Sequence, residues 1–415
     1  MPSSLRRRLL PLLLLGAVAA RVGYGLARPP QESGVSNADG YAHLAASFAE
    51  SWSLNQDDGR PSAYREPAYP IYLGLFFKAF GFNYRAALLA NGLAATLALL
   101  LLYRVGLELF GEEVAFAAAA IASFYPPFVF YAAQTLRETF QLAMSALALW
   151  VLIHARRRGL AAFALAGLAN AAAALSNTVF LPFTLVLAPA AFLFVLEGGA
   201  VHASKRAAAY LAAFLLLYSA WPVRNYLVFD RFIVGSTLGT GNIFYNYLIV
   251  PQEVGGTSRE GEIRENDPVV QAAGDVAPEA LDRYYWKAGL QRVRKAPASF
   301  VKLVAWRLLW DFWRVLPRPR AYVHSYDSIK WISLLSDGWI IPLGLLGMAL
   351  ARLRRPELLW LYLFVFSING IYSLILTMLR YRTPVMPWII LFACFAAQEL
   401  WGRLRLRYSR MTAHV

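Results

Sequence analysis

The chain has 415 residues, of which 58% are hydrophobic and 16% are charged. Soluble domains usually carry about a quarter charged residues, so this composition excludes an ordinary soluble fold and indicates an integral membrane protein. The formal net charge is +15. The basic residues stand in short clusters between apolar runs, as in the cytoplasmic loops of membrane proteins, and form no separate basic face, which argues against a nucleic-acid partner.

The apolar runs predict an all-α protein with about ten membrane-spanning helices. These helices are expected at residues 9–27, 84–104, 114–132, 138–154, 160–176, 179–196, 207–222, 331–351, 357–377 and 384–402. The first run follows three arginines, as in a secretory signal peptide. It continues past Arg21, whose long side chain can reach the interface, so we interpret it as an uncleaved span.

The positive-inside rule predicts the sidedness of these helices. If the N-terminal arginines are cytoplasmic, the later basic clusters are cytoplasmic as well, provided that residues 69–80 and 300–313 do not cross. Both segments mix apolar and charged side chains, and we expect short helices lying in the outer interface. Loops 28–83 and 223–330 are then extracytoplasmic and carry these helices.

This topology predicts three regions. Residues 1–222 form an N-terminal membrane module, 223–330 an extracytoplasmic loop, and 331–415 the last spans with a basic cytoplasmic tail. The acidic stretch 260–279 contains prolines and predicts irregular structure. The single cysteine, Cys394, lies in an apolar run and cannot form an internal disulfide.

Ionisable residues gather at the predicted outer ends of the helices. In the first loop, Asp39 precedes Tyr41 and His43 at the start of a short helix. Asp39 is interpreted either as the N-cap of that helix or as a general base at the membrane surface. Glu138 opens a later helix, where a carboxylate suits the positive end of the helix dipole; the alternative is a second active-site acid or a metal ligand.

Several arginines share this predicted outer face. Arg65 lies in the segment Tyr64-Arg-Glu-Pro-Ala-Tyr-Pro70, Arg224 in Trp221-Pro-Val-Arg-Asn-Tyr226, and Arg380 and Arg382 in Arg380-Tyr-Arg-Thr-Pro384. Guanidinium groups bind phosphate through two parallel hydrogen bonds, so an anionic ligand would explain basic residues there; contact with lipid headgroups is the alternative. Nucleotide motifs, His/Cys metal spacings and a nucleophile elbow are absent.

The order of these motifs resembles the polytopic C-type-fold glycosyltransferases, in the group of protein O-mannosyltransferases and bacterial aminoarabinose transferases that modify lipid A. The resemblance runs over nearly the whole chain, and the stretch from Trp221 to Ile233, with Gly241, Asn242 and Asn246, is especially similar to bacterial members. It implies a polyprenyl-phosphate-linked sugar donor, transfer with inversion, and a lipid, glycan or protein acceptor. The mannosyltransferases carry adjacent Asp and Glu in the first loop, whereas Gly40 follows Asp39 here.

The resemblance also assigns roles to residues. Asp39 matches the first-loop catalytic acid and Glu138 the second outer acidic position, and Arg65 falls near the donor phosphate. Asp39 is then the expected base and Glu138 its assistant or a cation ligand, so a divalent cation stays open. The candidate phosphate ligands are Arg65, Arg224, Arg380 and Arg382, and the candidate substrate-lining residues are Tyr41, His43, Tyr69 and Asn225.

Three alternatives remain at this point. A transporter or lipid flippase would need functional charges deep in the membrane, and few are found there. An envelope polysaccharide ligase or polymerase would depend more on loop 223–330 than on Asp39. A membrane scaffold without a site would leave the charged clusters apart from one another.

Overall fold

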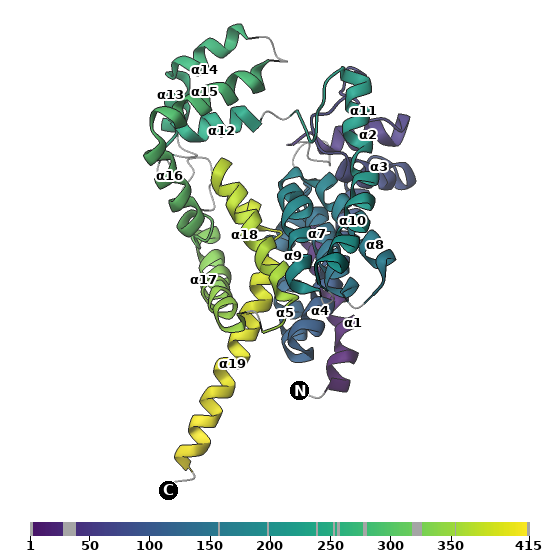
Figure 1. Cartoon of the computed structure of the whole chain (residues 1–415), viewed down its shortest axis with the longest axis vertical. Coiled ribbons are helices and arrows are strands. Elements are labelled where there is room, and N and C mark those ends of the chain that lie inside the picture. Colours follow the sequence, from purple (N-terminus) through teal and green to yellow (C-terminus); the bar gives the residue numbers. More distant parts are fainter. Residues whose placement is uncertain are drawn as a thin grey trace. The chain divides into compact units, whose positions relative to one another are not determined.

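The computed structural model describes residues 3–27, 39–156, 158–196, 199–237, 240–251, 254, 258–276, 280–317, 326–352 and 354–412. Within these residues the chain is helical and has no strand, apart from one isolated bridge between Asn55 and Pro61. This confirms the all-α membrane fold (Figure 1). Residues 28–38 at the start of the first predicted loop lie outside the described residues.

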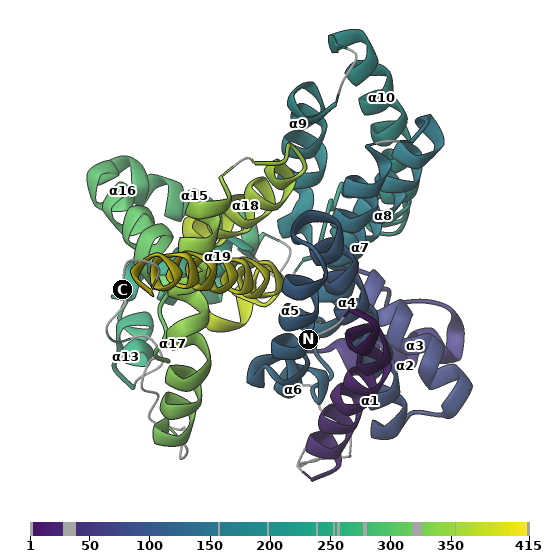
Figure 2. The same ribbon diagram turned by 90° about the horizontal axis from the view of Figure 1, so that it is seen from below.

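The first half of the chain contains the elements α1 to α11. Their bounds are α1 Ser3–Ala27, α2 Tyr41–Ser51, α3 Ala68–Phe80, α4 Tyr84–Phe110, α5 Glu112–Phe124, α6 Pro126–Ala132, α7 Glu138–Ala155, α8 Leu160–Ser176, η1 Thr178–Phe180, η2 Phe183–Leu187, α9 Ala188–Val195, α10 Gly199–Tyr218 and α11 Ala220–Phe229. Figure 2 shows α1 beside α4, α5 and α6, all of which it contacts.

The second half of the chain contains the elements α12 to α19. Their bounds are α12 Thr240–Ile249, α13 Ser258–Glu265, α14 Pro268–Ala272, η4 Ala273–Asp275, α15 Leu281–Lys295, α16 Pro297–Trp306, η5 Arg307–Asp311, α17 Tyr326–Ala351, α18 Leu358–Ile375, η6 Leu379–Arg382 and α19 Met386–Thr412. Helix α3 and the pair α16–η5 fall where the sequence predicts short interfacial helices.

Seven helical segments of the described residues are long and apolar enough to cross a membrane, or eight if one bent pair counts as a span. The sequence predicts about ten, and eight of these positions are covered when the bent pair counts as one span. Helices form at the two other predicted positions, but α8 has 17 residues and falls among the shorter apolar helices. The C-terminal half of α19 carries Arg403 and Arg405, which lower the apolarity of that helix.

The predicted span 114–132 is broken at Tyr125, where α5 and α6 meet at a bend of 55°. Pro126 and Pro127 begin α6 and have no N–H, so the carbonyls of Ala122 and Ser123, four residues earlier, lose their helical donors. The Arg21 guanidinium binds these two carbonyls, at 3.3 Å and 2.7 Å respectively. Arg21 is buried, so the expectation that its side chain reaches the interface is wrong: it caps α5.

Two further expectations are corrected by the helices. The span predicted to end at residue 222 continues through α11 to Phe229, so Arg224 and Asn225 lie in a helix and not in a loop. The described part of stretch 260–279 forms helices, because Asp267 caps α14 by accepting from the N–H groups of Val269 and Val270, with Pro268 at the first helical position. Residues 277–279 lie outside the described residues.

The chain divides into two compact units, which are described separately below. The first unit comprises residues 1–235, 339–367 and 383–415, and the second comprises residues 236–338 and 368–382. Helices α17 and α18 each contribute to both units. The three regions predicted from the topology stay a prediction. In the second unit α12 packs against α15 through Phe244 and Trp286, whose rings stack at 4.7 Å (Figure 1).

Candidate functional site

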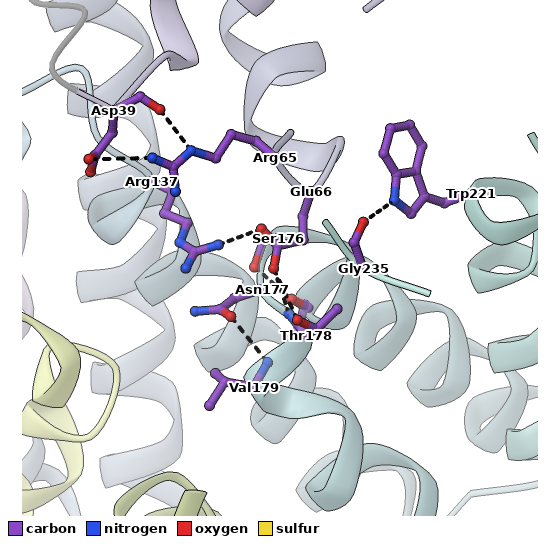
Figure 3. A network of polar contacts seen from close by, with 11 residues as sticks. Asp39, Arg65, Glu66, Arg137, Ser176, Asn177, Thr178, Val179, Trp221 and Gly235 are labelled. Atoms are coloured by element: carbon purple, nitrogen blue, oxygen red, sulfur yellow. Dashed lines mark hydrogen bonds and ion pairs between the residues drawn. The ribbon is translucent and has the colours of Figure 1, made fainter. Parts of the chain in front are cut away.

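The first loop places Asp39 beside Arg65, 26 residues later in the chain (Figure 3). The Arg65 Nε donates a 2.7 Å hydrogen bond to the Asp39 main-chain carbonyl, and Nη2 lies 3.4 Å from the Asp39 carboxylate. Gly40 is the N-cap of α2, with φ at +75°, a value that favours glycine. Asp39 is therefore not at the cap position, and its side chain faces a cation.

Aromatic rings hold the Arg65 guanidinium in place. Its central carbon lies 4.9 Å from the ring centroid of Tyr41 and 4.9 Å from that of Tyr64. The side chain is 7% exposed, against 23% for the side chain of Asp39. Within the described residues the Nη1 group of Arg65 has no hydrogen-bond partner, so two N–H donors are available to a ligand.

The next residue, Glu66, forms a second ion pair in the same place (Figure 3). Its Oε2 accepts a 2.6 Å hydrogen bond from Arg137, which is the N-cap residue of α7. Its Oε1 accepts from the hydroxyl of Thr178 at 3.0 Å and from the Thr178 N–H at 3.3 Å. Pro67 follows as the N-cap of α3, so the chain turns from this ion pair directly into a helix.

Asn177 orients the Thr178 N–H group toward Glu66. Its side chain accepts a 3.1 Å hydrogen bond from Val179 and caps the short helix η1, which begins at Thr178. Gly235 packs against the other side of Thr178, where a Cβ atom would lie 2.4 Å from the threonine methyl group. Trp221 holds the Gly235 carbonyl with a 2.6 Å hydrogen bond (Figure 3). Segments far apart in sequence thus meet around Glu66.

The charges of this cluster act on one another. Burial of Glu66 favours its neutral form, but the Arg137 cation and the hydrogen bonds that the carboxylate accepts outweigh burial and lower the pKa of Glu66. Tyr41 is fully buried between these groups. Burial, with the negative charges of Glu66 and Glu138, raises the pKa of Tyr41 far above its usual value, although Arg137 and Arg65 oppose the shift. Tyr41 is therefore a neutral hydroxyl at physiological pH.

Glu138 and Tyr69 belong to the same neighbourhood. Glu138 is the first residue of α7 and is buried. Tyr69 on α3 is buried too; its ring contacts Tyr41 edge to face at 5.3 Å, and its hydroxyl donates to Asn91 at 3.3 Å. Burial raises the pKa of Tyr69, and the Glu138 charge acts in the same direction. The structure therefore brings together Asp39, Arg65, Tyr41, Tyr69 and Glu138 of the predicted set.

Arg224 and Asn225 make contacts of a different kind. Arg224 on α11 donates to the main-chain carbonyls of Ser62, at 2.9 Å, and Leu54, at 3.4 Å. The Asn225 side chain is fully buried and donates to the Ile233 carbonyl at 3.0 Å. These bonds fasten the first loop and the segment after α11 to the helix. Their predicted roles in binding phosphate and substrate stay predictions.

His43 is half exposed on α2, and its Nδ1 lies 2.7 Å from the Asp57 carboxylate.

Arg380 and Arg382 belong to the second unit. Arg382 is buried in an ion pair with Asp337 and donates to the Arg314 carbonyl at 2.6 Å. Arg380 lies over the ring of Tyr381 at 5.2 Å. The structure therefore gives Arg382 an internal partner, whereas the sequence predicts a phosphate.

Two features complete the description of the site. Among the residues that the structure describes, no three His, Cys, Asp or Glu side chains gather as they would around a metal ion. Glu66, Arg137 and Thr178 are site residues that sequence reasoning missed. A signal was available, because Glu66 adjoins Arg65 and Arg137 adjoins Glu138, so each predicted position has an oppositely charged neighbour in sequence.

Comparison with known proteins identifies the fold. Residues 62–226, which include Arg65, Glu66, Arg137, Glu138 and Thr178, match the family model described as dolichyl-phosphate-mannose-protein mannosyltransferase. The match covers less than half of the chain. The resemblance drawn from the motifs is thereby confirmed. By sequence, no curated protein matches the chain.

Solved structures match the fold of nearly the whole chain. The oligosaccharyltransferase AglB from Archaeoglobus fulgidus, in complex with an inhibitory peptide and a dolichol-phosphate, matches with a TM-score of 0.61 at 14% identity over 98% of this chain and 52% of AglB. ArnT from Cupriavidus metallidurans, bound to undecaprenyl phosphate, matches with a TM-score of 0.50 at 13% identity over 97% of this chain and 63% of ArnT. The chain thus has the C-type glycosyltransferase fold and spans about half the length of AglB.

Proposed function

We propose that the chain is a membrane glycosyltransferase that moves a sugar from a polyprenyl-phosphate carrier to an acceptor hydroxyl or amine. The observation that carries this proposal is the pairing of Asp39 with Arg65 next to the Glu66–Arg137 pair. A carboxylate and a guanidinium side by side suit a displacement in which a proton leaves one group and negative charge grows on another. The family domain and the polyprenyl phosphates bound by the matched structures support the same chemistry.

The proposed reaction is a single inverting displacement. The Asp39 carboxylate takes the proton from the acceptor, and the acceptor oxygen or nitrogen forms a bond to the anomeric carbon. The bond between that carbon and the phosphate oxygen breaks, and its electron pair leaves with the polyprenyl phosphate. A lipid phosphate is a good leaving group, so the reaction needs no strong general acid. The products are the glycosylated acceptor and the free lipid phosphate.

Each residue of the cluster has a place in this scheme. Arg65 contacts the leaving phosphate through Nη1 while Nε stays on the Asp39 main chain. Glu66 and Arg137 are positioning residues, because they tie the loop before α3 to α7. Glu138 assists Asp39 from the start of α7. A divalent cation between Asp39 and Glu138 and phosphate contacts by Arg224, Arg380 and Arg382 remain parts of the proposal that await direct tests.

A transporter is less well supported by the contacts of the deep charges. Arg21 is a buried cation in the span α1, and its guanidinium is bound to the carbonyls of Ala122 and Ser123. Such a residue has a structural partner, whereas a transport residue must exchange partners during a cycle.

The proposed sidedness puts the site on the extracytoplasmic face of the bacterial cytoplasmic membrane. Soluble nucleotide sugars are made inside the cell, so an outer site needs a donor that the membrane itself presents. A Gly261→Cys variant in a Cys394→Ser background tests the sidedness, because the position on α13 is open and Cys394 is buried. A membrane-impermeant maleimide should label intact cells. Labelling that requires permeabilised membranes would place the loop on the cytoplasmic side and overturn this topology.

The activity is tested with the full chain in nanodiscs and a panel of synthetic polyprenyl-phosphate hexoses and pentoses. Release of free polyprenyl phosphate is the readout, and we expect one or more donors to be consumed. Arg65→Lys should raise the donor KM and lower kcat. A single ammonium cannot donate to the Asp39 carbonyl and bind a phosphate through two parallel hydrogen bonds at the same time. Arg60→Lys is the matched control, since Arg60 lies in the same loop and pairs with Asp58. Equal kinetics for both variants would remove Arg65 from the site.

A further inference from the structure

The segment from residue 283 to residue 310 carries seven basic side chains and no acidic one. The basic residues are Arg283, Lys287, Arg292, Arg294, Lys295, Lys302 and Arg307. Six of them are exposed, and Arg307 is buried. The segment covers most of α15, all of α16 and the start of η5 in the second unit. Extracytoplasmic loops are usually poor in basic residues, so this density on the proposed outer face calls for an anionic counterpart.

The chain makes an elbow in the middle of this segment. Helix α15 ends at Lys295, and α16 begins at Pro297, which cannot continue the preceding helix. Ala296 forms the turn, with φ at −139° and ψ at 61°. Arg292, Arg294 and Lys295 occupy the last turn of α15, where the helix dipole favours cations. The elbow therefore concentrates positive charge beside the first turn of α16.

The inner side of the elbow is fixed to the rest of the second unit. The Phe300 ring meets Phe244 of α12 edge to face at 6.2 Å. Arg307 donates to the Tyr247 carbonyl at 2.8 Å and to the Ile375 carbonyl at 3.2 Å. These contacts set the rotation of α16 and η5 about their axis, so the opposite side faces away from the unit.

That outward side is apolar. Val301 is 63% exposed, Leu309 73% and Trp310 69%, and Trp306 is also exposed. Trp306, Leu309 and Trp310 are three and four residues apart, a spacing that puts them on neighbouring turns of one face. An apolar face with tryptophans, continued by a group of cations, is typical of a helix that lies in the headgroup region of a bilayer.

We infer that the α15–α16 elbow docks on anionic phospholipid headgroups of the surrounding bilayer. Arg292, Arg294, Lys295 and Lys302 bind the phosphates, while Val301, Trp306, Leu309 and Trp310 enter the boundary of the acyl chains. A bilayer offers phosphates directly above an apolar layer, which matches a basic group and an apolar stripe on consecutive turns, and the chain itself spans such a bilayer. The inference does not depend on the proposed glycosyl transfer.

The first experiment measures whether the apolar face enters the bilayer. In a Cys394→Ser background, an environment-sensitive fluorophore is attached at Leu309→Cys or, as the control, at Glu262→Cys on α13. Both proteins are reconstituted into vesicles with nitroxide-labelled phospholipid. We expect strong quenching at position 309 and little at position 262. Equal quenching at both positions would overturn the inference, as would quenching at position 309 that falls when more protein is packed into each vesicle, because a second copy would then cover the face.

The second experiment measures the preference for anionic lipid. A fluorophore at Ser299→Cys reports quenching by headgroup-labelled phosphatidylglycerol and by the matching phosphatidylcholine. We expect phosphatidylglycerol to quench several-fold more, since a cation near an anionic surface contributes roughly fivefold to association. Arg294→Gln with Lys295→Gln should remove most of that excess. The control pair Arg259→Gln and Arg264→Gln on α13 should leave it unchanged. Equal quenching by the two lipids, or an undiminished excess in the Arg294 and Lys295 variant, would overturn the inference.

Discussion

The Arg137 guanidinium donates a 2.6 Å hydrogen bond to the Glu66 carboxylate, across 71 residues of sequence. This bond ties the start of α7 to the loop before α3, while the neighbouring residue Arg65 holds Asp39. The two pairs share one peptide segment, so a change that moves the backbone at one pair also moves the other. Predictions about the proposed base therefore have to separate charge from position.

Glu66→Gln should make stability less dependent on acid pH. The folded protein lowers the pKa of Glu66 below its ordinary value of 4.5, so its carboxylate stabilises the fold above that pH, and this contribution is lost as the pH falls through the lowered folded-state pKa. In detergent, the unfolding temperature of the wild type should exceed that of Glu66→Gln by a constant margin from pH 7 to about pH 5. The margin should shrink at lower pH. A margin that stays constant down to the acid limit would mean that the ionised carboxylate is not its source.

Asp39→Asn should lose sugar transfer by roughly 10²–10⁴-fold, the usual contribution of a general base. The N-cap of α2 is Gly40, so the helix does not need the Asp39 side chain as its cap. The main-chain carbonyl of residue 39 still accepts from Arg65, so the guanidinium stays in place. The measurement is release of polyprenyl phosphate at saturating donor. Asp58→Asn, an exposed carboxylate in the same loop, is the control and should keep near-native turnover. Near-native transfer by Asp39→Asn would remove the base assignment.

Arg21→Leu should destabilise the membrane module by about 1–3 kcal/mol, because the carbonyls of Ala122 and Ser123 then have no donor. Arg8→Leu on the same helix is exposed and serves as the control. The cause can be checked with Pro126→Ala and Pro127→Ala, which return the missing N–H groups. In that background Arg21→Leu should lower the unfolding temperature by less than it does in the wild type. The same cost in both backgrounds would contradict the capping role.

Arg382 and Arg380 should respond differently to lysine. Arg382 is 3% exposed and engages both Asp337 and the Arg314 carbonyl, a pair of contacts that one ammonium cannot reproduce. Arg382→Lys should therefore lower the unfolding temperature. Arg380→Lys should leave stability near native and reduce donor use if Arg380 binds phosphate. If Arg382→Lys weakened donor use without lowering the unfolding temperature, the result would favour the predicted role of Arg382 in binding phosphate.

Hydropathy located the spans because a bilayer imposes a length and an apolar composition that any sequence reveals. The break at Tyr125 was harder to place, since the residues on both sides of it are apolar, although Pro126 and Pro127 marked the position. The positions of the arginines in the sequence did not reveal which groups their side chains contact. Arg21 and Arg382 bind groups distant in sequence, and a sequence gives no direct record of such partners.

Asp39, Arg65 and Glu138, which the structure brings together, were predicted from local motifs, and their roles stay predictions. Glu66 and Thr178 were not, because their roles depend on the folding of α8 and η1 against the first loop, at a separation of 112 residues. Arg224 looked like a ligand from its side of the membrane, but its bonds to the Ser62 and Leu54 carbonyls appear only in three dimensions.

The bond between Arg21 and Ser123 also sets an order of events during biosynthesis. The two residues are separated by 102 positions, which a ribosome takes about 5–20 s to translate. Until α5 and its proline break emerge, the guanidinium has only the Ala17 carbonyl of its own helix and neither of the two α5 carbonyls that it binds in the finished protein. An arginine with one partner in place of three is costly in hydrocarbon, so the nascent α1 must wait with this residue hydrated, at the membrane surface or in the insertion machinery. Helix α1 is thus made before α5 but reaches its final depth only after α5 has emerged.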